Sequence, residues 1–106
     1  KINNLLVQPE ILSANEALSL LRITQEAIIN AVKYARIEEI VITISKNEIS
    51  DFLLEITDNG IGFDQSIPNI GNGLTNMKER AQEINFTCSI RSEQGKGCTI
   101  LLVKNG

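Results

Sequence analysis

Two pairs of glycines follow an acidic residue in the middle of the sequence. Asp58 comes just before Gly60 and Gly62, and Gly71 and Gly73 stand eleven residues further on. Glycine allows a positive φ and a close approach of backbone to a flat ligand, and the first amides of a helix form an anion site. A carboxylate at the end of a strand can accept a hydrogen bond from an amine. Either pair alone fits a turn and a helix cap. A nucleotide pocket is the alternative, and the rest of the sequence must decide between the two.

A polar stripe on the first predicted helix could supply further ligands. At about 100° per residue, one side of this helix carries Glu26, Asn30, Lys33 and Tyr34. The opposite side is expected to be apolar, with Ala27, Ile28, Ala31 and Ala35. An amide oxygen, an ammonium and a ring suit Mg²⁺, phosphate and a base or ribose, and one Asn is adequate because Mg²⁺ keeps most of its waters. An ordinary solvated face is the alternative.

The elements that position these residues follow from periodicity and turn residues. A capping box at Ser13 and Glu16 and helical spacing predict a helix over 14–35. The remaining pattern predicts a second helix over 73–84 and strands over 2–7, 40–46, 52–57, 86–92 and 98–104. Hairpins imply mostly antiparallel pairing. The expected fold class is α/β (α+β): a two-layer sandwich of a mostly antiparallel mixed sheet, with the helices on one face.

Length and composition fit a single domain over 1–106. The chain has 106 residues, 42% of them hydrophobic, which is enough for one core. No apolar run approaches 18 residues and no signal segment is visible, so this segment is expected to be cytoplasmic and to make no membrane contact. The chain begins with Lys1, and we expect a fragment of a longer protein, which could carry a membrane anchor elsewhere.

Charge and residue content exclude several kinds of chemistry. A net charge of −3 argues against binding to nucleic acid. Cys88 and Cys98 fall on apolar phases of predicted strands, which favours buried thiols in a reducing compartment. Two Cys without His exclude the usual zinc spacings. The absence of histidine also excludes Ser-His-Asp and Cys-His catalysis, and phosphohistidine on this segment.

The ordered motifs resemble the ATP-binding catalytic domain of bacterial sensor histidine kinases, with the Bergerat fold. The wider group includes gyrase B, the Hsp90 chaperones and MutL. "QEAIINAVKYA" is similar to the N box, "DNGIGF" to the G1 box, "GNGL" to the G2 box and "GKGCT" to the last glycine box. The resemblance covers nearly the whole chain. The short lid from Phe63 to Gly73, followed by "LTNMKERA", is most similar to kinases that pair with helix-turn-helix response regulators.

The resemblance implies a role for each matching residue. On the first helix, Asn30 would hold Mg²⁺, Lys33 would reach phosphate and Tyr34 would line the nucleotide pocket. Glu26 would polarise the attacking histidine, and Asp58 would bond the adenine amino group.

The loop residues would form the rest of the nucleotide site. Gly60 and Gly62 would shape the pocket floor, and Ile61 and Leu74 would pack near the base. Phe63 would begin the lid, which Gly71 and Gly73 would hinge while presenting amides to phosphate.

Two departures from the family pattern affect these roles. The last box usually reads Gly-Thr, but here it is Gly97-Cys98, with Thr99 next, and we count Cys98 and Thr99 among the nucleotide-binding residues. A thiol is a weaker hydrogen-bond partner than a hydroxyl, so the contact of this box near the base is in question. The Lys33-Tyr34 pair is that of the broader kinase family, whereas many members of the subfamily carry His there.

The resemblance implies the Mg-ATP-binding part of a protein-histidine kinase. It would position the γ-phosphate for transfer to a histidine on upstream dimerisation helices, with a response regulator as a further partner. An ATPase of the gyrase or chaperone kind is one alternative, but it would need a longer lid and a partner domain that supplies a Lys. A nucleotide-binding module without catalysis is the other, and Cys98 keeps it open.

Overall fold

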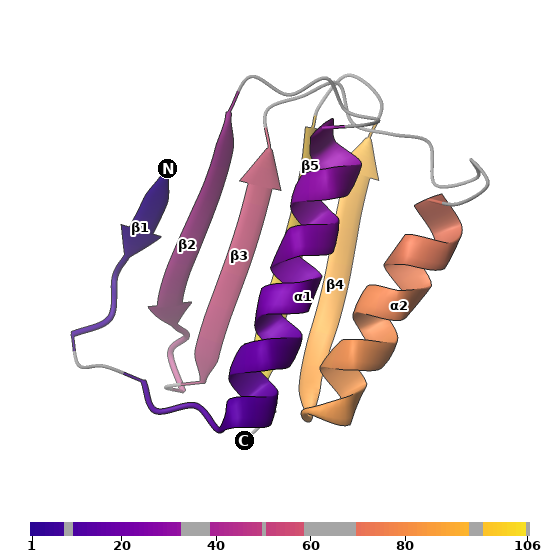
Figure 1. Ribbon diagram of the computed structural model, residues 1–106. Coiled ribbons are helices and arrows are strands. Elements are labelled where there is room, and N and C mark those ends of the chain that lie inside the picture. Colours follow the sequence, from indigo (N-terminus) through magenta and orange to yellow (C-terminus); the bar gives the residue numbers. More distant parts are fainter. Residues whose placement is uncertain (8–9, 33–38, 50, 59–69, 94–96, 106) are drawn as a thin grey trace.

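The fold is a five-stranded sheet with two helices on one face (Figure 1). The structure is a computed structural model that describes residues 1–7, 10–32, 39–49, 51–58, 70–93 and 97–105. Its elements are β1 (Ile2–Asn4), α1 (Ala14–Asn30), β2 (Ile40–Lys46), β3 (Phe52–Asp58), α2 (Ile70–Glu83), β4 (Phe86–Glu93) and β5 (Gly97–Lys104). The predicted two-layer sandwich is confirmed.

The strands follow the order β1-β2-β3-β5-β4, and only the pairing of β1 with β2 is parallel. The register places Asp58 between Ile40 and Cys98, and it places Ser92 on the other side of Cys98. Directly paired residues on neighbouring strands present their side chains on the same face. These four residues therefore form one row across the sheet, which we call the pocket row.

The hydrophobic core lies between the helices and the sheet. Alternate residues of β3 point inward, as expected for Phe52, Leu54 and Ile56. The ring of Phe52 meets that of Phe86 edge to face, with centroids 6.2 Å apart. The buried cluster comprises Leu20, Ile23, Ala27, Phe52, Leu54, Ile56, Leu74, Met77, Ala81, Phe86, Cys98, Ile100 and Leu102.

Polar contacts fix the start of α1. The predicted capping box is present: the Ser13 N–H donates to Glu16 Oε1 at 2.9 Å, and the Glu16 N–H donates to Ser13 Oγ at 3.1 Å. The backbone hydrogen bond from Ser13 lowers the pKa of Glu16, and Lys104 adds to this effect. The ammonium of Lys104 forms a salt bridge with Glu16 at 3.4 Å and a second one with Glu10. Glu10 also forms a salt bridge with Lys46. These contacts hold the helix over the sheet.

Two predicted boundaries differ from those of the structure. The first strand was expected over 2–7, but β1 ends at Asn4, and the last ladder-like bond is from the Leu5 N–H to the Ile44 carbonyl at 2.8 Å. The first helix was expected to reach 35. The structure ends α1 at Asn30 and continues through Val32 in a wider π-helical turn, and 33–38 lie outside the described residues.

The second helix starts earlier than predicted. It begins at Ile70, so Gly71 and Gly73 lie in its first turn and not before it. The first four amides of any helix lack partners within the helix, so glycine there costs only its low helix propensity, about 1 kcal/mol each. The core contacts of Leu74 and Met77 oppose this cost.

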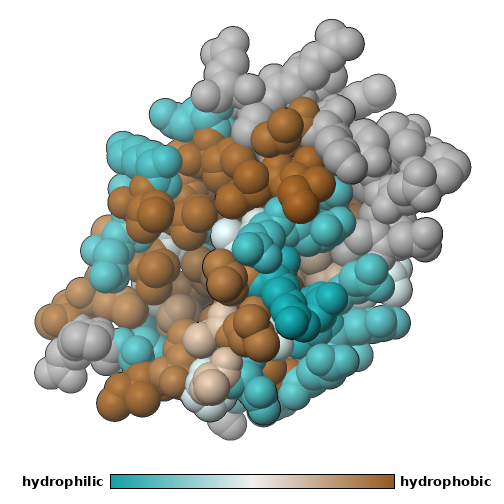
Figure 2. All heavy atoms as spheres, in the orientation of Figure 1, coloured by the Kyte–Doolittle hydropathy of each residue, from teal (hydrophilic) through white to brown (hydrophobic). Residues whose placement is uncertain are grey.

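The helix-bearing face is divided between apolar and polar surface. In Figure 2, apolar side chains gather over β1, β2 and one side of α1, whereas polar side chains cover α2. The exposed large apolar residues are Ile2, Leu5, Val7, Ile11, Leu18, Leu21, Ile29, Val32 and Ile49. Within the described ranges, no helix combines the length and the apolar character needed to cross a membrane.

Candidate nucleotide site

One end of the fold gathers the ends of several elements. There α1 and β3 end, while β2, β5 and α2 begin (Figure 1). The last residue of β3 is Asp58, and the first of β5 is Gly97. Helix ends carry amides or carbonyls without intrahelical partners, so this end is suited to hold a polar ligand.

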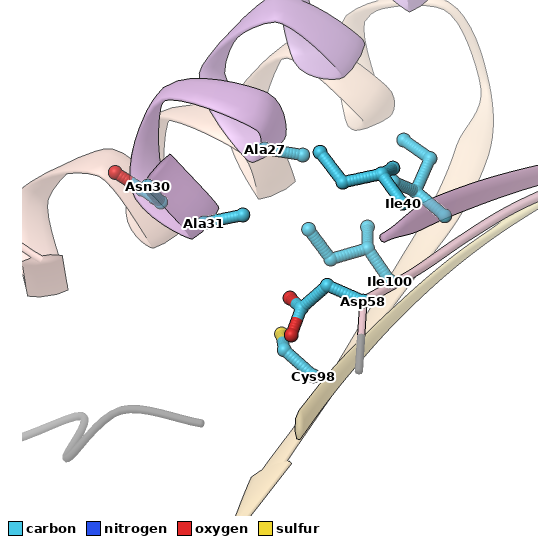
Figure 3. A pocket seen from close by; sticks show the side chains of 8 residues that line it. Ala27, Asn30, Ala31, Ile40, Asp58, Cys98 and Ile100 are labelled. Carbon is cyan, nitrogen blue, oxygen red and sulfur yellow. The ribbon is translucent and has the colours of Figure 1, made fainter. Parts of the chain in front are cut away.

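A pocket at this end lies between α1 and the sheet (Figure 3). It is lined by Ala27, Asn30, Ala31, Ile40, Ile56, Asp58, Cys98 and Ile100. The space open to a water-sized sphere is about 10 Å³, roughly the room of one water. Aliphatic walls with an amide and a carboxylate are the lining that suits a flat ring with a polar edge.

Asn30 is buried at the pocket with an unsatisfied amide. Its side chain is 5% exposed, and its Nδ2 has no hydrogen-bond partner. An unpaired buried polar group costs about 1–3 kcal/mol, and a ligand that accepted a hydrogen bond from Nδ2 would remove this cost. Asn30 shares this pocket with Ala27 and Ala31, which were predicted on the opposite side of the helix. The prediction was wrong for Ala27 because residues three apart on a helix lie on the same side, and Ala31 lines the same pocket from the position next to Asn30.

The amide of Asn30 fits a role toward Mg²⁺. The oxygen and nitrogen of an amide exchange places when it turns, so an oxygen can face the position that Nδ2 occupies. Mg²⁺ takes one or two protein oxygens and otherwise uses water and phosphate. Within the described part of the chain, no three His, Cys, Asp or Glu residues gather as a metal cluster.

Asp58 supplies the carboxylate of the pocket. Asp58 is 8% exposed, and its side chain points toward the pocket beside the Cys98 sulfur (Figure 3). The pairing of β3 with β2 and β5 places it between Ile40 and Cys98. An ionised carboxylate is purely an acceptor, so it is suited to an amino group on the edge of a base.

Gly97 is a site residue that the sequence analysis missed. It has φ +83°, and a Cβ there would overlap the backbone carbonyl oxygen of Asp58 and lie 3.5 Å from Oδ1. Glycine is required both for this backbone conformation and for the close approach of β5 to Asp58. The second glycine of "GKG" could have indicated a position that requires glycine, but the sequence analysis assigned it only to a hairpin loop and a glycine box.

Cys98 is a buried, free and protonated thiol. It is 5% exposed, as predicted for an apolar strand phase. Burial raises the pKa of Cys98 to about 11, the Asp58 charge adds to the rise, and a hydrogen bond from Ser92 opposes it. At neutral pH the thiol is therefore a hydrogen-bond donor and not a nucleophile. Cys88 is half-buried and free, and burial raises its pKa as well.

Three predicted site residues lie away from this pocket. Thr99 follows Cys98 in the strand and so faces the opposite side of the sheet, beside Glu55 and Arg91. Glu26 is half-buried in a separate groove between α1 and α2. Leu74 is buried in the core, and its expected place near the base stays a prediction.

Several predicted residues cannot be placed in this way. Lys33, Tyr34, Gly60, Ile61, Gly62 and Phe63 lie outside the described residues. Gly71 and Gly73 are placed by their backbone in the first turn of α2. The first turn of α2 lies at the end of the fold where α1 and β3 end (Figure 1), and the first turn of a helix is where an anion site forms.

Residues 15–104 match the family described as "Histidine kinase-, DNA gyrase B-, and HSP90-like ATPase". The chain belongs to this family. Among curated members, it is 30% identical over 95 residues to the nitrate/nitrite sensor protein NarX of Escherichia coli (strain K12). It is 35% identical over 83 residues to the oxygen sensor histidine kinase NreB of Staphylococcus carnosus (strain TM300). These alignments cover 89% and 76% of the chain but only 16% and 24% of the relatives.

Solved structures of the family share the fold. The histidine kinase domain from the Erythrobacter litoralis EL346 blue-light activated kinase superposes with a TM-score of 0.76 at 13% identity, over 97% of this chain and 49% of that chain. Full-length ShkA in complex with AMPPNP superposes with a TM-score of 0.77 at 18% identity, over 97% of this chain and 24% of that chain. At these identities the likeness concerns the fold of this histidine kinase-, gyrase B- and HSP90-like ATPase domain.

Proposed function

We propose that residues 1–106 are the Mg-ATP-binding domain of a two-component sensor histidine kinase. The observation that carries this is the pocket in which the unpartnered amide of Asn30 and the buried carboxylate of Asp58 line the same apolar space. The similarity of this chain, over most of its length, to the sensor kinases NarX and NreB supports the same assignment. The ATP-binding ATPase family sets the ligand class.

The pocket residues would divide the nucleotide between them. Asp58 would accept a hydrogen bond from the adenine amino group, while Ile40, Ile56 and Ile100 would flank the ring. Asn30 would hold Mg²⁺, whose charge would neutralise the phosphates. The motif residues Lys33, Tyr34, Gly60, Ile61, Gly62 and Phe63 would complete the site, as would the first turn of α2.

The histidine that accepts phosphate must come from another part of the protein. The chain contains no histidine, and phosphoryl transfer asks mainly for positioning and charge neutralisation. We propose that this domain supplies both, and that upstream dimerisation helices carry the acceptor. A response regulator would then receive the phosphoryl group. This domain would work in the cytoplasm, as part of a longer protein that could be membrane-anchored.

Binding is tested by heating the 106-residue chain with and without Mg-ATP. A ligand at 100 times its Kd stabilises the folded state by about 2.7 kcal/mol, which for a domain of this size raises Tm by roughly 10 °C or more. Asn30→Ala is expected to lose most of the Mg²⁺-dependent part of this rise. Since its Nδ2 has no partner, the same change should cost little stability without ligand.

Gln25→Ala is the matched control, because Gln25 is an exposed polar residue on the same helix. It should behave as wild type in both measurements. A flat melting curve for wild type at saturating Mg-ATP would reject the nucleotide site. An Asn30→Ala variant that keeps the full Mg²⁺ dependence would assign the metal to another residue.

Phosphoryl transfer is tested with radiolabelled ATP. The isolated domain is expected to bind ATP and to acquire no acid-labile label, because it has no acceptor imidazole. Addition of the upstream helical segment of the parent in trans should produce label on that segment, and Asn30→Ala should abolish it. Acid-labile label on the domain alone would contradict the kinase assignment, since no histidine is present to carry it.

A further inference from the structure

Helix α1 carries apolar residues on two opposite sides. One side packs on the sheet through Leu20, Ile23 and Ala27, which are all buried. The other side carries a second set of residues, all of them exposed, which we call the outer row: Leu18, Leu21, Gln25, Ile29 and Val32. At about 100° per residue, the outer row lies roughly opposite the buried side. A helix that is apolar on both sides is typical of one that is covered on both sides.

The spacing of the outer row matches the packing of one helix along another. Its members are separated by three, four, four and three positions. The average of about 3.5 is the repeat that keeps one side of a helix in contact with a partner helix. Each of the four apolar members is at least 46% exposed. Single exposed apolar residues are ordinary on a protein surface, but an aligned row over about 20 Å of helix marks an interaction surface.

The outer row is symmetric about Gln25, so it is complementary to a second copy of itself. Leu18 and Val32 stand seven positions before and after Gln25, and Leu21 and Ile29 stand four positions before and after it. In an antiparallel pair of α1 helices with a two-fold axis at Gln25, Leu18 therefore lies opposite the partner's Val32, and Leu21 lies opposite the partner's Ile29. Gln25 meets its own copy, and an amide can both donate and accept. A two-fold interface requires such a match of a surface with itself.

Charges beside the outer row favour the antiparallel pair over a parallel one. Arg22 and Glu26 lie on the flank that faces α2, where they line a groove with Arg80. In an antiparallel two-fold pair this flank meets the same flank of the partner, so Arg22 of each copy comes near Glu26 of the other. In a parallel pair it would meet the opposite flank, where Thr24 and Ile28 carry no charge. Exposed ion pairs add little affinity, but they select the orientation of two partners.

We propose that the outer row is a self-association surface, through which two copies of this domain pair by their α1 helices. The nucleotide pocket lies between α1 and the sheet, on the other side of the helix, so the inference goes beyond the proposed function and does not depend on it. One pair of helices buries less than the roughly 800 Å² per partner of stable complexes. We therefore expect a weak dimer, with a Kd on the order of 100 µM. Dimerisation elsewhere in the parent would raise the effective concentration to about the millimolar range and favour the pair.

Sedimentation equilibrium of the 106-residue chain tests the surface. The average mass of wild type is expected to rise from that of a monomer at about 10 µM toward that of a dimer at about 1 mM. Leu21→Glu buries a charge in the pair and should weaken association by about tenfold or more. Ile49→Glu is the matched control and should associate like wild type, since Ile49 is 78% exposed and lies in the turn between β2 and β3. Melting curves at low concentration check that both variants fold.

Disulfide formation tests the direction of the pair. In a Cys88→Ser background, a mixture of Leu18→Cys and Val32→Cys chains is expected to form a crosslinked heterodimer, because these positions oppose each other in the antiparallel pair. Either chain alone should crosslink much less. Cys98 is buried and should take no part. Crosslinks in each chain alone, and none between the two chains of the mixture, would overturn the antiparallel arrangement.

The remaining outcomes separate a second copy from other occupants. Wild type that stays monomeric at about 1 mM would overturn the inference and leave the nucleotide site as proposed. A dimer that Leu21→Glu leaves unchanged would place association on another surface and also overturn it. If the domain stays monomeric but the upstream helical segment of the parent binds wild type and not Leu21→Glu, the outer row belongs to that segment. A flat response to Mg-ATP in a chain that dimerises would overturn the proposed function alone.

Discussion

Asp58→Ala is expected to lower the affinity for ATP by roughly 5- to 150-fold, which corresponds to a loss of about 1–3 kcal/mol. The substitution removes the carboxylate of the pocket, and in the proposed site it would leave the adenine amino group without an acceptor. Inosine triphosphate has a carbonyl in place of the amino group, and in wild type this carbonyl would face the carboxylate as a second acceptor. It should therefore bind to Asp58→Ala at least as tightly as it binds to wild type. Titration calorimetry with both nucleotides measures the change in preference.

Glu55→Ala provides the control for the loss of one acidic residue. Glu55 is an exposed carboxylate on the same strand as Asp58, with its side chain on the opposite face of the sheet. It should keep the wild-type preference for ATP, and melting curves of both variants check the fold. An Asp58→Ala variant that still prefers ATP over inosine triphosphate would remove Asp58 from the base subsite.

Gly97→Ala is expected to destabilise the folded chain by about 2–5 kcal/mol. Part of this is the cost of a positive φ for a residue with a Cβ, about 1–2 kcal/mol. The rest is the overlap of that Cβ with the Asp58 carbonyl, comparable with overpacking, about 1–3 kcal/mol. The backbone must move at Asp58 to relieve the overlap, so ATP affinity should fall even where the variant is fully folded.

Asn85→Ala separates these two contributions. Asn85 also has a positive φ, +62°, and its side chain donates a long hydrogen bond of 3.4 Å to the Asn105 carbonyl. Alanine there should show the conformational cost without the overlap, and ATP affinity should not change. Urea denaturation of the two variants gives the comparison. Equal destabilisation by Gly97→Ala and Asn85→Ala would show that overlap of the new Cβ with the Asp58 carbonyl oxygen contributes nothing to the loss of stability.

The elements were predictable where the signal is local. The capping box at Ser13 and the alternating residues of 52–57 depend on neighbours in sequence, and both are confirmed. The start of α2 was missed because helix propensity at Gly71 and Gly73 is outweighed by core contacts further along the helix. The strand over 2–7 was predicted, but β1 ends at Asn4, because its length depends on pairing with β2, which is distant in the sequence.

The site was predictable in its residue types more than in its contacts. Asn30 and Asp58 were selected from motif spacing, and the structure brings them to one pocket. Thr99 was selected with Cys98, although neighbours in a strand face opposite sides and this rule would have separated them. The close approach of Gly97 to Asp58 depends on the register of β5 with β3, which no local pattern contains.

The pairing of β3 with β5 also ties nucleotide binding to the order of folding. The hairpins β2–β3 and β4–β5 join strands that are adjacent in sequence, so their loops close early and at low entropic cost. Asp58 comes from one hairpin, and Gly97 and Cys98 come from the other. We expect the base subsite to form only when the two hairpins dock, at a late step. ATP would then not bind a partly folded chain in which only one hairpin has formed. Nucleotide would stabilise only the state in which both hairpins have docked.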